Sequence, residues 1–245
     1  MAQLIQFEKT SCYATSEEEA KFIYKEIFED GCYDVAGLPD APFVVDAGAN
    51  IGMFSLFVKQ KFPAAKVLAF EPAPETYGIL RRNLELHGLS DVETVPCGLA
   101  SRASTEKFTY FPNLPGNSTL KPEEKKQLCE LAAASRGREA AQQRFDGAQE
   151  FDVKLERLSD VLSSRPEFSR IDFLKVDVEG AELEVLRGLD DAHWGIVRNV
   201  VLETWDASGV RGEIEELLRA KGFTLKCEEA PWSKGFWMIS ASREG

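Results

Sequence analysis

The sequence predicts an α/β fold in which one mostly parallel sheet has helices on both faces. Short apolar segments alternate with segments of helical length along most of the 245 residues, a length that fits one domain with insertions. Strands separated by such helices imply βαβ units, whose strands pair in parallel. A turn containing two glycines, Gly48 to Gly52, joins the first strand of the alternation to its first helix.

Residues 1–40 predict a short preamble and one helix that covers the sheet. Thr15 or Ser16 can cap this helix, and glutamates stand in its first turn, where the helix dipole favours anions. Gly31 ends it. We expect residues 41–245 to form the main domain.

Seven apolar segments predict the strands of the sheet. They are residues 43–46, 66–71, 92–96, 171–177, 199–203, 223–227 and 235–240. The helices predicted between them are residues 53–62, 74–87, 180–187 and 209–221. Pro63 ends the first of these helices and Gly88 the second. Only a short connection separates the last two strands, so they can pair antiparallel.

Residues 101–158 interrupt the alternation and predict an insertion on the sheet without a core of its own. They hold a strand-like segment, 106–111, a turn-rich segment, 112–119, and a long polar helical segment, 121–150. The helical segment carries six Lys or Arg and six Asp or Glu residues, so it is neutral at 6 − 6. We expect the insertion to act as a lid or a partner surface, or to be a solvated helix.

The composition disfavours several classes of protein. Lys plus Arg is 29 and Asp plus Glu is 41, so the formal net charge is 29 − 41 = −12. A body this acidic is a poor general binder of nucleic acid and argues against a polybasic membrane anchor. The five cysteines are widely spaced without a CxxC pair, so we expect free thiols. The absence of a visible signal peptide and of a membrane-spanning apolar run predicts a cytoplasmic protein.

The turn after the first strand predicts a cofactor site. Gly48 lets the backbone approach a ligand, and Gly52 lets the following helix pack against the strand. Asp46 ends the strand with a carboxylate that we expect to point into the cleft. Asn50 replaces the central glycine of a dinucleotide-binding GxGxxG turn, which disfavours a pyrophosphate ligand and an NAD oxidoreductase. The pattern suits a cofactor with an ammonium and a carboxylate group.

Carboxylates at the ends of three further strands complete the predicted site. Glu71 ends the second strand, 23 residues after Gly48, where an acidic residue can accept hydrogen bonds from both ribose hydroxyls of an adenosine. Asp177 and Glu203 end the fourth and fifth strands, so they can share a cleft as a general-base pair or bind a divalent metal. Glu182, in the helix after Asp177, is expected to face solvent or to form a structural pair.

Four segments together resemble the FkbM family of S-adenosylmethionine-dependent methyltransferases. They are VVDAGANIGMFSLF (44–57), FEPAPETY (70–77), NSTL (117–120) and IDFLKVDVEGAELEVLRGL (171–189). The likeness spans about Phe22 to Trp205, and residues 109–120 also resemble members from polyketide and non-ribosomal peptide pathways. It implies the Rossmann-like class I methyltransferase fold, with seven strands in the order 3-2-1-4-5-7-6 and strand 7 antiparallel. It also implies methyl transfer from S-adenosyl-L-methionine, usually to a hydroxyl oxygen.

The resemblance assigns the candidate residues to parts of a site. The methionine end of the cofactor would be held by Asp46, Gly48, Ala49, Asn50 and Gly52. The ribose would be held by Glu71 and Pro72, and the adenine flanked by Cys97, Gly98 and Leu99. Asp177 would face the amino group or the acceptor. The acceptor site would include Asn113, Asn117, Ser118, Thr119 and Trp205.

The chemistry of the acceptor stays open. His87 and His193 are expected to be a helix cap and a structural residue, so removal of a proton falls to Asp177, to Glu203 or to a magnesium ion between them. Methylation of a carboxyl, a nitrogen or a carbon and a non-catalytic cofactor-binding protein are alternatives. We expect a small-molecule or carrier-tethered acceptor and no nucleic-acid or membrane partner. The oligomeric state is open and includes a dimer.

Nucleic-acid methylation is the nearest rival, and two motifs disfavour it. The sequence DVEG, residues 177–180, stands where an amine-methylating (N/D)PP(Y/F) motif should follow the fourth strand. Cys97 follows the third strand, which is the wrong place for the nucleophile of a cytosine methyltransferase. We expect Cys97 to be a buried residue of the cleft wall.

Overall fold

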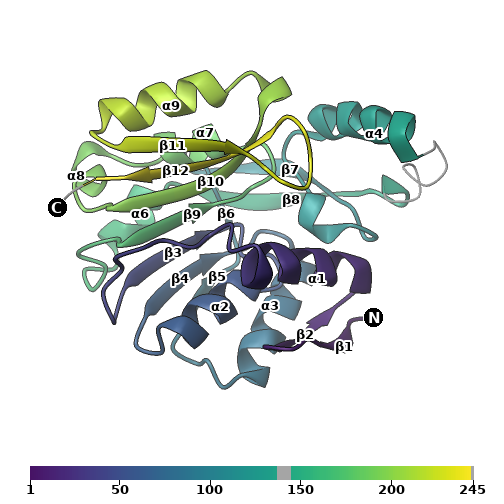
Figure 1. Cartoon of the computed structure of the whole chain (residues 1–245), viewed down its shortest axis with the longest axis horizontal. Coiled ribbons are helices and arrows are strands. Elements are labelled where there is room, and N and C mark those ends of the chain that lie inside the picture. Colours follow the sequence, from purple (N-terminus) through teal and green to yellow (C-terminus); the bar gives the residue numbers. More distant parts are fainter. Residues whose placement is uncertain (137–144, 244–245) are drawn as a thin grey trace.

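The computed structural model describes residues 1–136 and 145–243, and its centre is a seven-stranded sheet (Figure 1). The strands are β3 (Phe43–Ala47), β4 (Lys66–Phe70), β5 (Glu93–Val95), β9 (Phe173–Val176), β10 (Asn199–Trp205), β11 (Thr224–Glu229) and β12 (Phe236–Ser242). Numbered along the chain within this sheet, they lie in the order 3-2-1-4-5-7-6. β12 is antiparallel to both of its neighbours and the other pairs are parallel. The predicted fold class is confirmed.

Each face of the sheet carries its own hydrophobic core, because successive side chains of a strand point to opposite faces. On β3, Val44 packs into one core and Val45 into the other. On β4, Val67 and Leu68 divide in the same way. All four side chains are buried. Such continuous apolar strands are typical of a parallel sheet that is covered on both faces.

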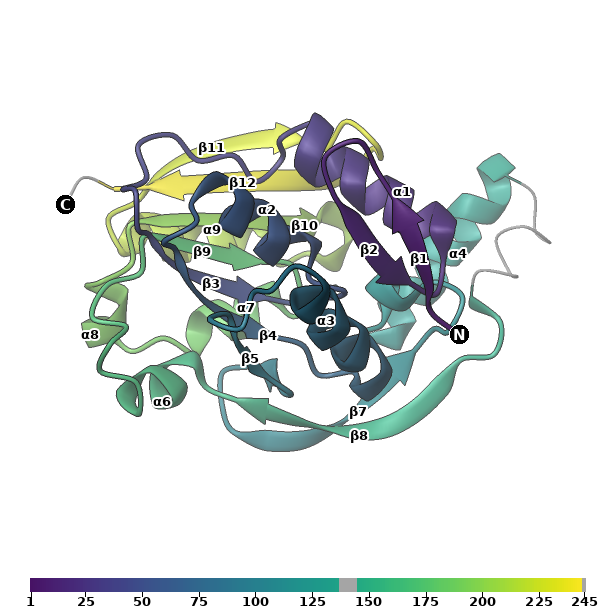
Figure 2. The ribbon, with the colours of Figure 1, turned by 90° about the horizontal axis from the view of Figure 1, so that it is seen from below.

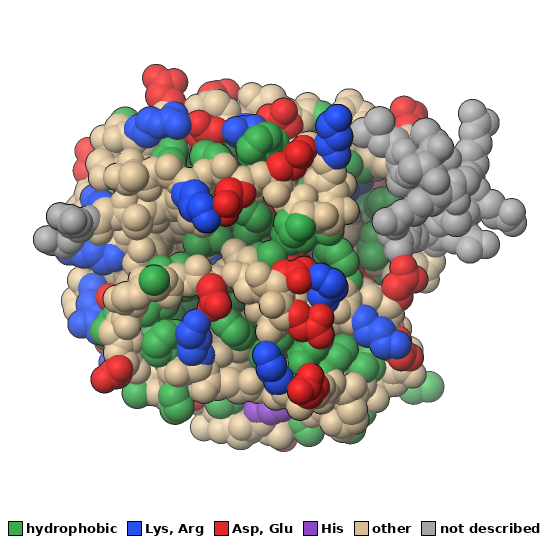
Figure 3. Space-filling model, viewed as in Figure 1, with side chains coloured by type: hydrophobic (Ala, Val, Ile, Leu, Met, Phe, Trp, Pro, Cys, Tyr) green, Lys and Arg blue, Asp and Glu red, His purple; other side chains and the backbone are tan. Residues whose placement is uncertain are grey.

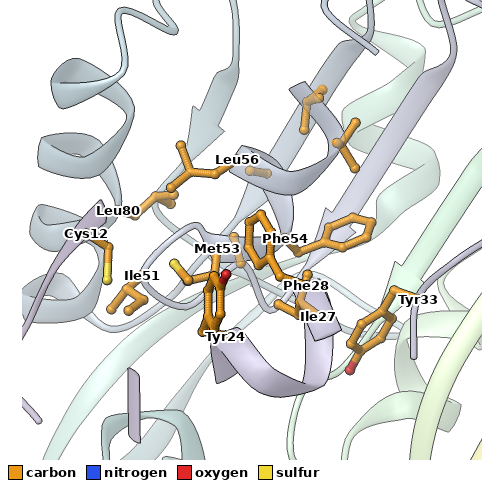
Figure 4. Close-up of a cluster of buried hydrophobic side chains, with 14 of the residues drawn as sticks. Cys12, Tyr24, Ile27, Phe28, Tyr33, Ile51, Met53, Phe54, Leu56 and Leu80 are labelled. Atoms are coloured by element: carbon orange, nitrogen blue, oxygen red, sulfur yellow. The ribbon is translucent and has the colours of Figure 1, made fainter. Parts of the chain in front are cut away.

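The helices form a layer on each face (Figures 1 and 2). One layer comprises α1 (Glu17–Tyr24), α2 (Met53–Lys61) and α3 (Pro74–Leu86), and the other α6 (Leu158–Ser163), α7 (Glu182–Arg187), α8 (Asp191–Trp194) and α9 (Arg211–Ala220). Figure 4 shows the first core, where Met53 and Phe54 of α2 meet Tyr24 and Ile27 of the N-terminal segment. The N-terminal segment therefore contributes to the main core.

This N-terminal segment has more structure than predicted. Its preamble is a hairpin in which β1 (Gln3–Gln6) pairs antiparallel with β2 (Ser11–Ala14). Ser16 caps α1, and its hydroxyl oxygen accepts a hydrogen bond from the N–H of Glu19 at 3.2 Å. The helix continues through one π-helical turn, η1 (Lys25–Glu29), and Gly31 follows with a left-handed φ of 67°.

The insertion forms a small sheet with a core of its own, so the prediction of an insertion without a core is wrong. Its strands are β6 (Gly98–Leu99), β7 (Ser104–Tyr110) and β8 (Gln149–Glu156), in the order β6-β8-β7. Its hydrophobic core combines four buried residues of the insertion, Phe108, Tyr110, Val153 and Leu155, with Ala73 and Ala100 from outside it. The polar segment between the long strands begins as α4 (Pro122–Arg136), after a 3-10 turn, η2 (Pro115–Asn117). The predicted helical segment 121–150 ends as β8 instead, and residues 137–144 lie outside the described residues.

The surface is mixed in charge. On the face in Figure 3, acidic and basic side chains of the described residues are interspersed. Among the helices of residues 1–136 and 145–243, none combines the length and the apolar character that a membrane span requires.

Candidate active site

The carboxyl ends of β3, β4, β9 and β10 border two adjoining cavities, where open α/β sheets usually bind ligands. The larger, of about 640 Å³, is lined by residues that include Gly48, Asn50, Glu71, Pro72, Gly98, Leu99, Pro115, Gly116 and Ser118. The smaller, of about 370 Å³, is lined by residues that include Glu124, Lys125, Leu128, Glu182, Glu203, Trp205 and Phe236. Asp177 and Glu179 line both cavities.

The turn after β3 fits against the end of β9 so tightly that one position must be glycine. A Cβ atom at Gly48 would lie 1.8 Å from the carbonyl oxygen of Asp177. Gly48 also has a left-handed φ of 79°. The N–H groups of Gly48 and Ala49 donate to the carbonyl of Phe70 at 3.1 and 2.8 Å, which ties the turn to the end of β4. Gly52, with a φ of 90°, is the N-cap of α2.

Glu71 lies where the sequence placed it, at the wall of the larger cavity. One of its carboxylate oxygens accepts from the N–H of Asn50 at 3.0 Å, and the other from the N–H of Ala73 at 2.9 Å. Burial raises the pKa of Glu71 to about 7 despite these two hydrogen bonds. Gly98 and Leu99 line the same cavity.

Two residues predicted for the cofactor site face elsewhere. Asp46 is fully buried and lines neither cavity, because β3 continues to Ala47 and the Asp46 side chain points toward α2. There it accepts a hydrogen bond from the hydroxyl of Ser55 at 2.8 Å. Cys97 also lines neither cavity and packs in the second core, where burial raises its thiol pKa to about 11. Asp46 and Cys97 therefore lie outside both cavity linings, although Cys97 is buried as expected.

Lys175, which the sequence reasoning missed, links the turn to Asp177. It is buried in β9, and its ammonium donates to the carbonyl of Gly48 at 2.6 Å. It lies 3.2 Å from Oδ1 of Asp46 and 3.7 Å from Oδ2 of Asp177. Burial disfavours its charge, but the two aspartates more than offset this and raise its pKa. A lysine within an apolar strand was the available signal.

The structure brings Asp177 and Glu203 to the same small cavity, from the ends of neighbouring strands. Burial, and secondarily the charge of Asp177, raise the pKa of Glu203 well above its ordinary value. Burial likewise raises the pKa of Glu26 to about 8, with Asp177 as the next cause. Glu179 has a left-handed φ of 58° and pairs with the buried Lys125. The cavity therefore concentrates carboxyl groups, and burial favours the neutral form of Glu203.

Glu182 does not face solvent, contrary to expectation. It is buried, accepts from the N–H of Gly180 at 2.9 Å and has a pKa raised to about 7 by burial. The histidines lie apart from both cavities: His87 contacts the carbonyl of Ser11 at 2.7 Å, and Nδ1 of His193 contacts Ser159 at 2.9 Å. Within the described residues, no three His, Cys, Asp or Glu side chains group as metal ligands would.

The turn predicted for the acceptor site lies at the larger cavity. Ser118 lines the larger cavity, and Asn113 is exposed and lines neither. Asn117 accepts from the ammonium of Lys125 at 3.3 Å. Thr119 is buried and donates to the carbonyl of Glu179 at 2.7 Å, so its hydroxyl holds the turn in place. Trp205 lines the smaller cavity.

Comparisons with known proteins identify the family. The family model described as the methyltransferase FkbM domain matches residues 46–225. Methyltransferase sdnD of Sordaria araneosa is 57% identical over 251 residues, covering 99% of this chain and 97% of that protein. The 31-O-demethyl-FK506 methyltransferase FkbM of Streptomyces tacrolimicus is 37% identical, covering 89% of this chain and 86% of that protein.

A solved structure agrees in fold. The crystal structure of methyltransferase FkbM from Methylobacillus flagellatus KT aligns with a TM-score of 0.59 at 13% identity, covering 89% of this chain and 47% of that one. This likeness shows the fold alone, and the family rests on the sequence matches. The chain belongs to the FkbM family of methyltransferases.

Proposed function

We propose that this protein transfers the methyl group of S-adenosyl-L-methionine to a hydroxyl oxygen of a small-molecule or carrier-bound natural-product intermediate. The observation that carries the proposal is the pair of adjoining cavities with Asp177 at their border. Methyl transfer from a sulfonium is an in-line displacement, so catalysis depends on holding donor and acceptor on opposite sides of one carbon. Two cavities that meet at a carboxylate suit this requirement.

The residues of the larger cavity fit the cofactor. Glu71 presents a buried carboxylate for the ribose hydroxyls, and Gly48 leaves the backbone of the turn open to a ligand. The carboxylates of Asp177 and Glu179 favour a ligand that carries a positive sulfonium and an ammonium group. When bound, S-adenosylmethionine supplies the electrophilic methyl group.

In the smaller cavity, two carboxyl groups take different roles. Asp177 accepts the proton of the acceptor hydroxyl as the methyl group is transferred. Glu203, whose pKa is raised by burial, donates a hydrogen bond in its neutral form and so orients the acceptor oxygen. Trp205 and Phe236, whose ring centroids lie 6.2 Å apart, give the cavity an apolar wall for the carbon skeleton. The sequence suggested a general-base pair or a metal site, and this proposal instead gives the two carboxyl groups different roles.

An oxygen acceptor is supported by the relative from Streptomyces tacrolimicus, whose name specifies a 31-O position. Methylation of nitrogen or carbon is the alternative. A non-catalytic protein that keeps only the fold is less consistent with the tightly built turn at Gly48 and with Glu71 at the cavity wall, whereas a non-catalytic cofactor-binding protein stays an alternative. The absence of nucleic-acid and membrane partners, the cytoplasmic location and the dimer stay predictions from the sequence.

Two measurements test the proposal. In calorimetry, S-adenosylmethionine should bind the wild-type protein and bind Glu71→Ala at least about tenfold more weakly, because about one charge-assisted hydrogen bond is lost. Glu85→Ala, an exposed glutamate of α3, is the matched control and should bind normally. Mass spectrometry with alcohols, amines and carboxylic acids should then find a product heavier by one CH₂ group among the alcohols. Failure of the wild type to bind the cofactor, or methylation of amines alone, would contradict the proposal.

A further inference from the structure

One contact at the site comes from outside the region that the family model matches. The hydroxyl of Tyr33 donates a hydrogen bond to Oδ2 of Asp177 at 3.1 Å. Tyr33 precedes the matched residues 46–225 and lies 144 residues from its partner. We propose that Tyr33 is a positioning residue of the methyltransferase site, whose hydroxyl, together with the ammonium of Lys175, fixes the Asp177 carboxylate at the border of the two cavities. This inference rests on the proposed function, in which Asp177 faces the cofactor and the acceptor.

The ring of Tyr33 is held rigidly, which a positioning residue requires. Its side chain is buried, and its ring packs edge-on against Phe54 with centroids 5.6 Å apart. Figure 4 shows Tyr33 at the edge of the core, with its hydroxyl directed away from Phe54. Because the ring is fixed by the core, the hydroxyl stays at one place beside Asp177.

The hydroxyl acts as a donor. Burial raises the pKa of Tyr33 well above its ordinary value, and the charges of Asp177 and Glu26 raise it further, so the group keeps its proton at neutral pH. A carboxylate offers only acceptors, so the direction of the hydrogen bond to Asp177 is fixed.

Both positioning contacts use the same oxygen of Asp177. The Tyr33 hydroxyl and the Lys175 ammonium approach Oδ2, at 3.1 and 3.7 Å. The Asp177 side chain is still 31% exposed and lines both cavities. The second oxygen, Oδ1, is thereby left for a ligand, with the rotation of the carboxylate restrained through Oδ2.

A purely structural role for Tyr33 is the competing explanation, and the chemistry separates the two. Packing against Phe54 would be satisfied by phenylalanine, which has the same ring. A buried hydroxyl costs free energy unless it is hydrogen-bonded, so its presence adds nothing to packing alone. The hydroxyl therefore matters only if its effect passes through Asp177.

A double-mutant cycle tests this, with S-adenosylmethionine affinity measured by calorimetry as the readout. The four proteins are the wild type, Tyr33→Phe, Asp177→Asn and the double variant. We expect Tyr33→Phe to weaken binding about three- to tenfold when Asp177 is present, and by less than about twofold in the Asp177→Asn background. Tyr77→Phe, which removes a hydroxyl that contacts Thr94 at 2.9 Å, is the matched control and should bind normally.

Each outcome decides the inference. Wild-type affinity in Tyr33→Phe, or the same loss in both backgrounds, overturns the positioning role. A loss of affinity that occurs only when Asp177 is present supports the positioning role. The same pattern in turnover, measured with an alcohol that the enzyme methylates, supports it further. Absence of cofactor binding by the wild type is a different result, since it refutes the proposed function itself.

Discussion

The two cavities differ in what forms their walls. The larger is lined in part by three glycines, Gly48, Gly98 and Gly116, at each of which an added Cβ atom would lie less than 3.0 Å from a neighbouring atom. The smaller is shaped by ionisable and aromatic side chains, among them Asp177 and Glu203. Added atoms at the glycines of the larger cavity would clash with their neighbours. The smaller cavity depends instead on the balance of charge among its side chains.

This difference predicts how each cavity will respond to substitution. Steric changes should damage the larger cavity, because its walls cannot move without moving the sheet. Changes of charge should damage the smaller one, because its carboxyl groups lie close together and the charge of Asp177 helps to raise the pKa of Glu203. Lys175 contacts the backbone of the first cavity and the carboxylate of the second, so it connects the two.

Substitution of Lys175 should give the largest effect, a loss of folding stability. Lys175→Met leaves the fully buried Asp46 without its counter-charge, which typically destabilises a protein by about 3–5 kcal/mol. Lys59→Met is the control, because Lys59 is equally buried but pairs with the exposed Asp91, and we expect about 1–3 kcal/mol there. Urea unfolding measures both. Equal losses in the two variants would show that the Lys175 network has no special role.

Gly48→Ala should have the next largest effect, through the larger cavity that Gly48 lines. The added Cβ would lie 1.8 Å from the carbonyl oxygen of Asp177, so the turn must shift. We expect S-adenosylmethionine affinity to fall at least about a hundredfold, or about 2.7 kcal/mol. Gly37→Ala is the control, since Gly37 has a similar φ of 75° but nothing within 4 Å of the new Cβ. If both variants bind equally well, the larger cavity is not the cofactor site.

The difference between the two cavities explains which parts of the site could be predicted from the sequence. The turn at Gly48 and the acid at Glu71 are local features, fixed by strands that follow each other along the chain, and both lie at the larger cavity as predicted. The strand order followed from the resemblance. Asp46 was misplaced because successive side chains of β3 alternate between the two faces, so Asp46 lies on the same face as Val44 and accepts a hydrogen bond from Ser55 of α2.

The smaller cavity was harder to predict because its contacts are distant in sequence. Asp177 accepts a hydrogen bond from Tyr33, which lies 144 residues away in the sequence, and Glu179 pairs with Lys125, which lies 54 residues away. No local pattern marks Tyr33. The burial of Glu182 was missed for a related reason, since its carboxylate turns back to the N–H of Gly180 in a loop of left-handed residues.

Asp177→Asn should impair the function of the smaller cavity by removing a negative charge, with little change in the shape of the side chain. We expect turnover to fall about a hundredfold, at the lower end of the range of about 10²–10⁴-fold that a general base typically contributes, because an amide cannot accept the proton. Cofactor affinity should fall less, by about tenfold. Asp152→Asn, an exposed aspartate of β8, is the control. Turnover at the wild-type rate would exclude Asp177 as the base.

Glu203→Gln should have the smallest effect, and its size tests the assignment of roles within the smaller cavity. Burial and Asp177 raise the pKa of Glu203 well above its ordinary value, so its neutral form already resembles glutamine. We expect turnover to fall less than about threefold in Glu203→Gln, since the amide still donates a hydrogen bond, and at least about tenfold in Glu203→Ala. If Glu203→Gln instead falls as far as Asp177→Asn, then Glu203 also removes a proton. Glu203 would then act as a base like Asp177, and the assignment of different roles to the two carboxyl groups would be wrong.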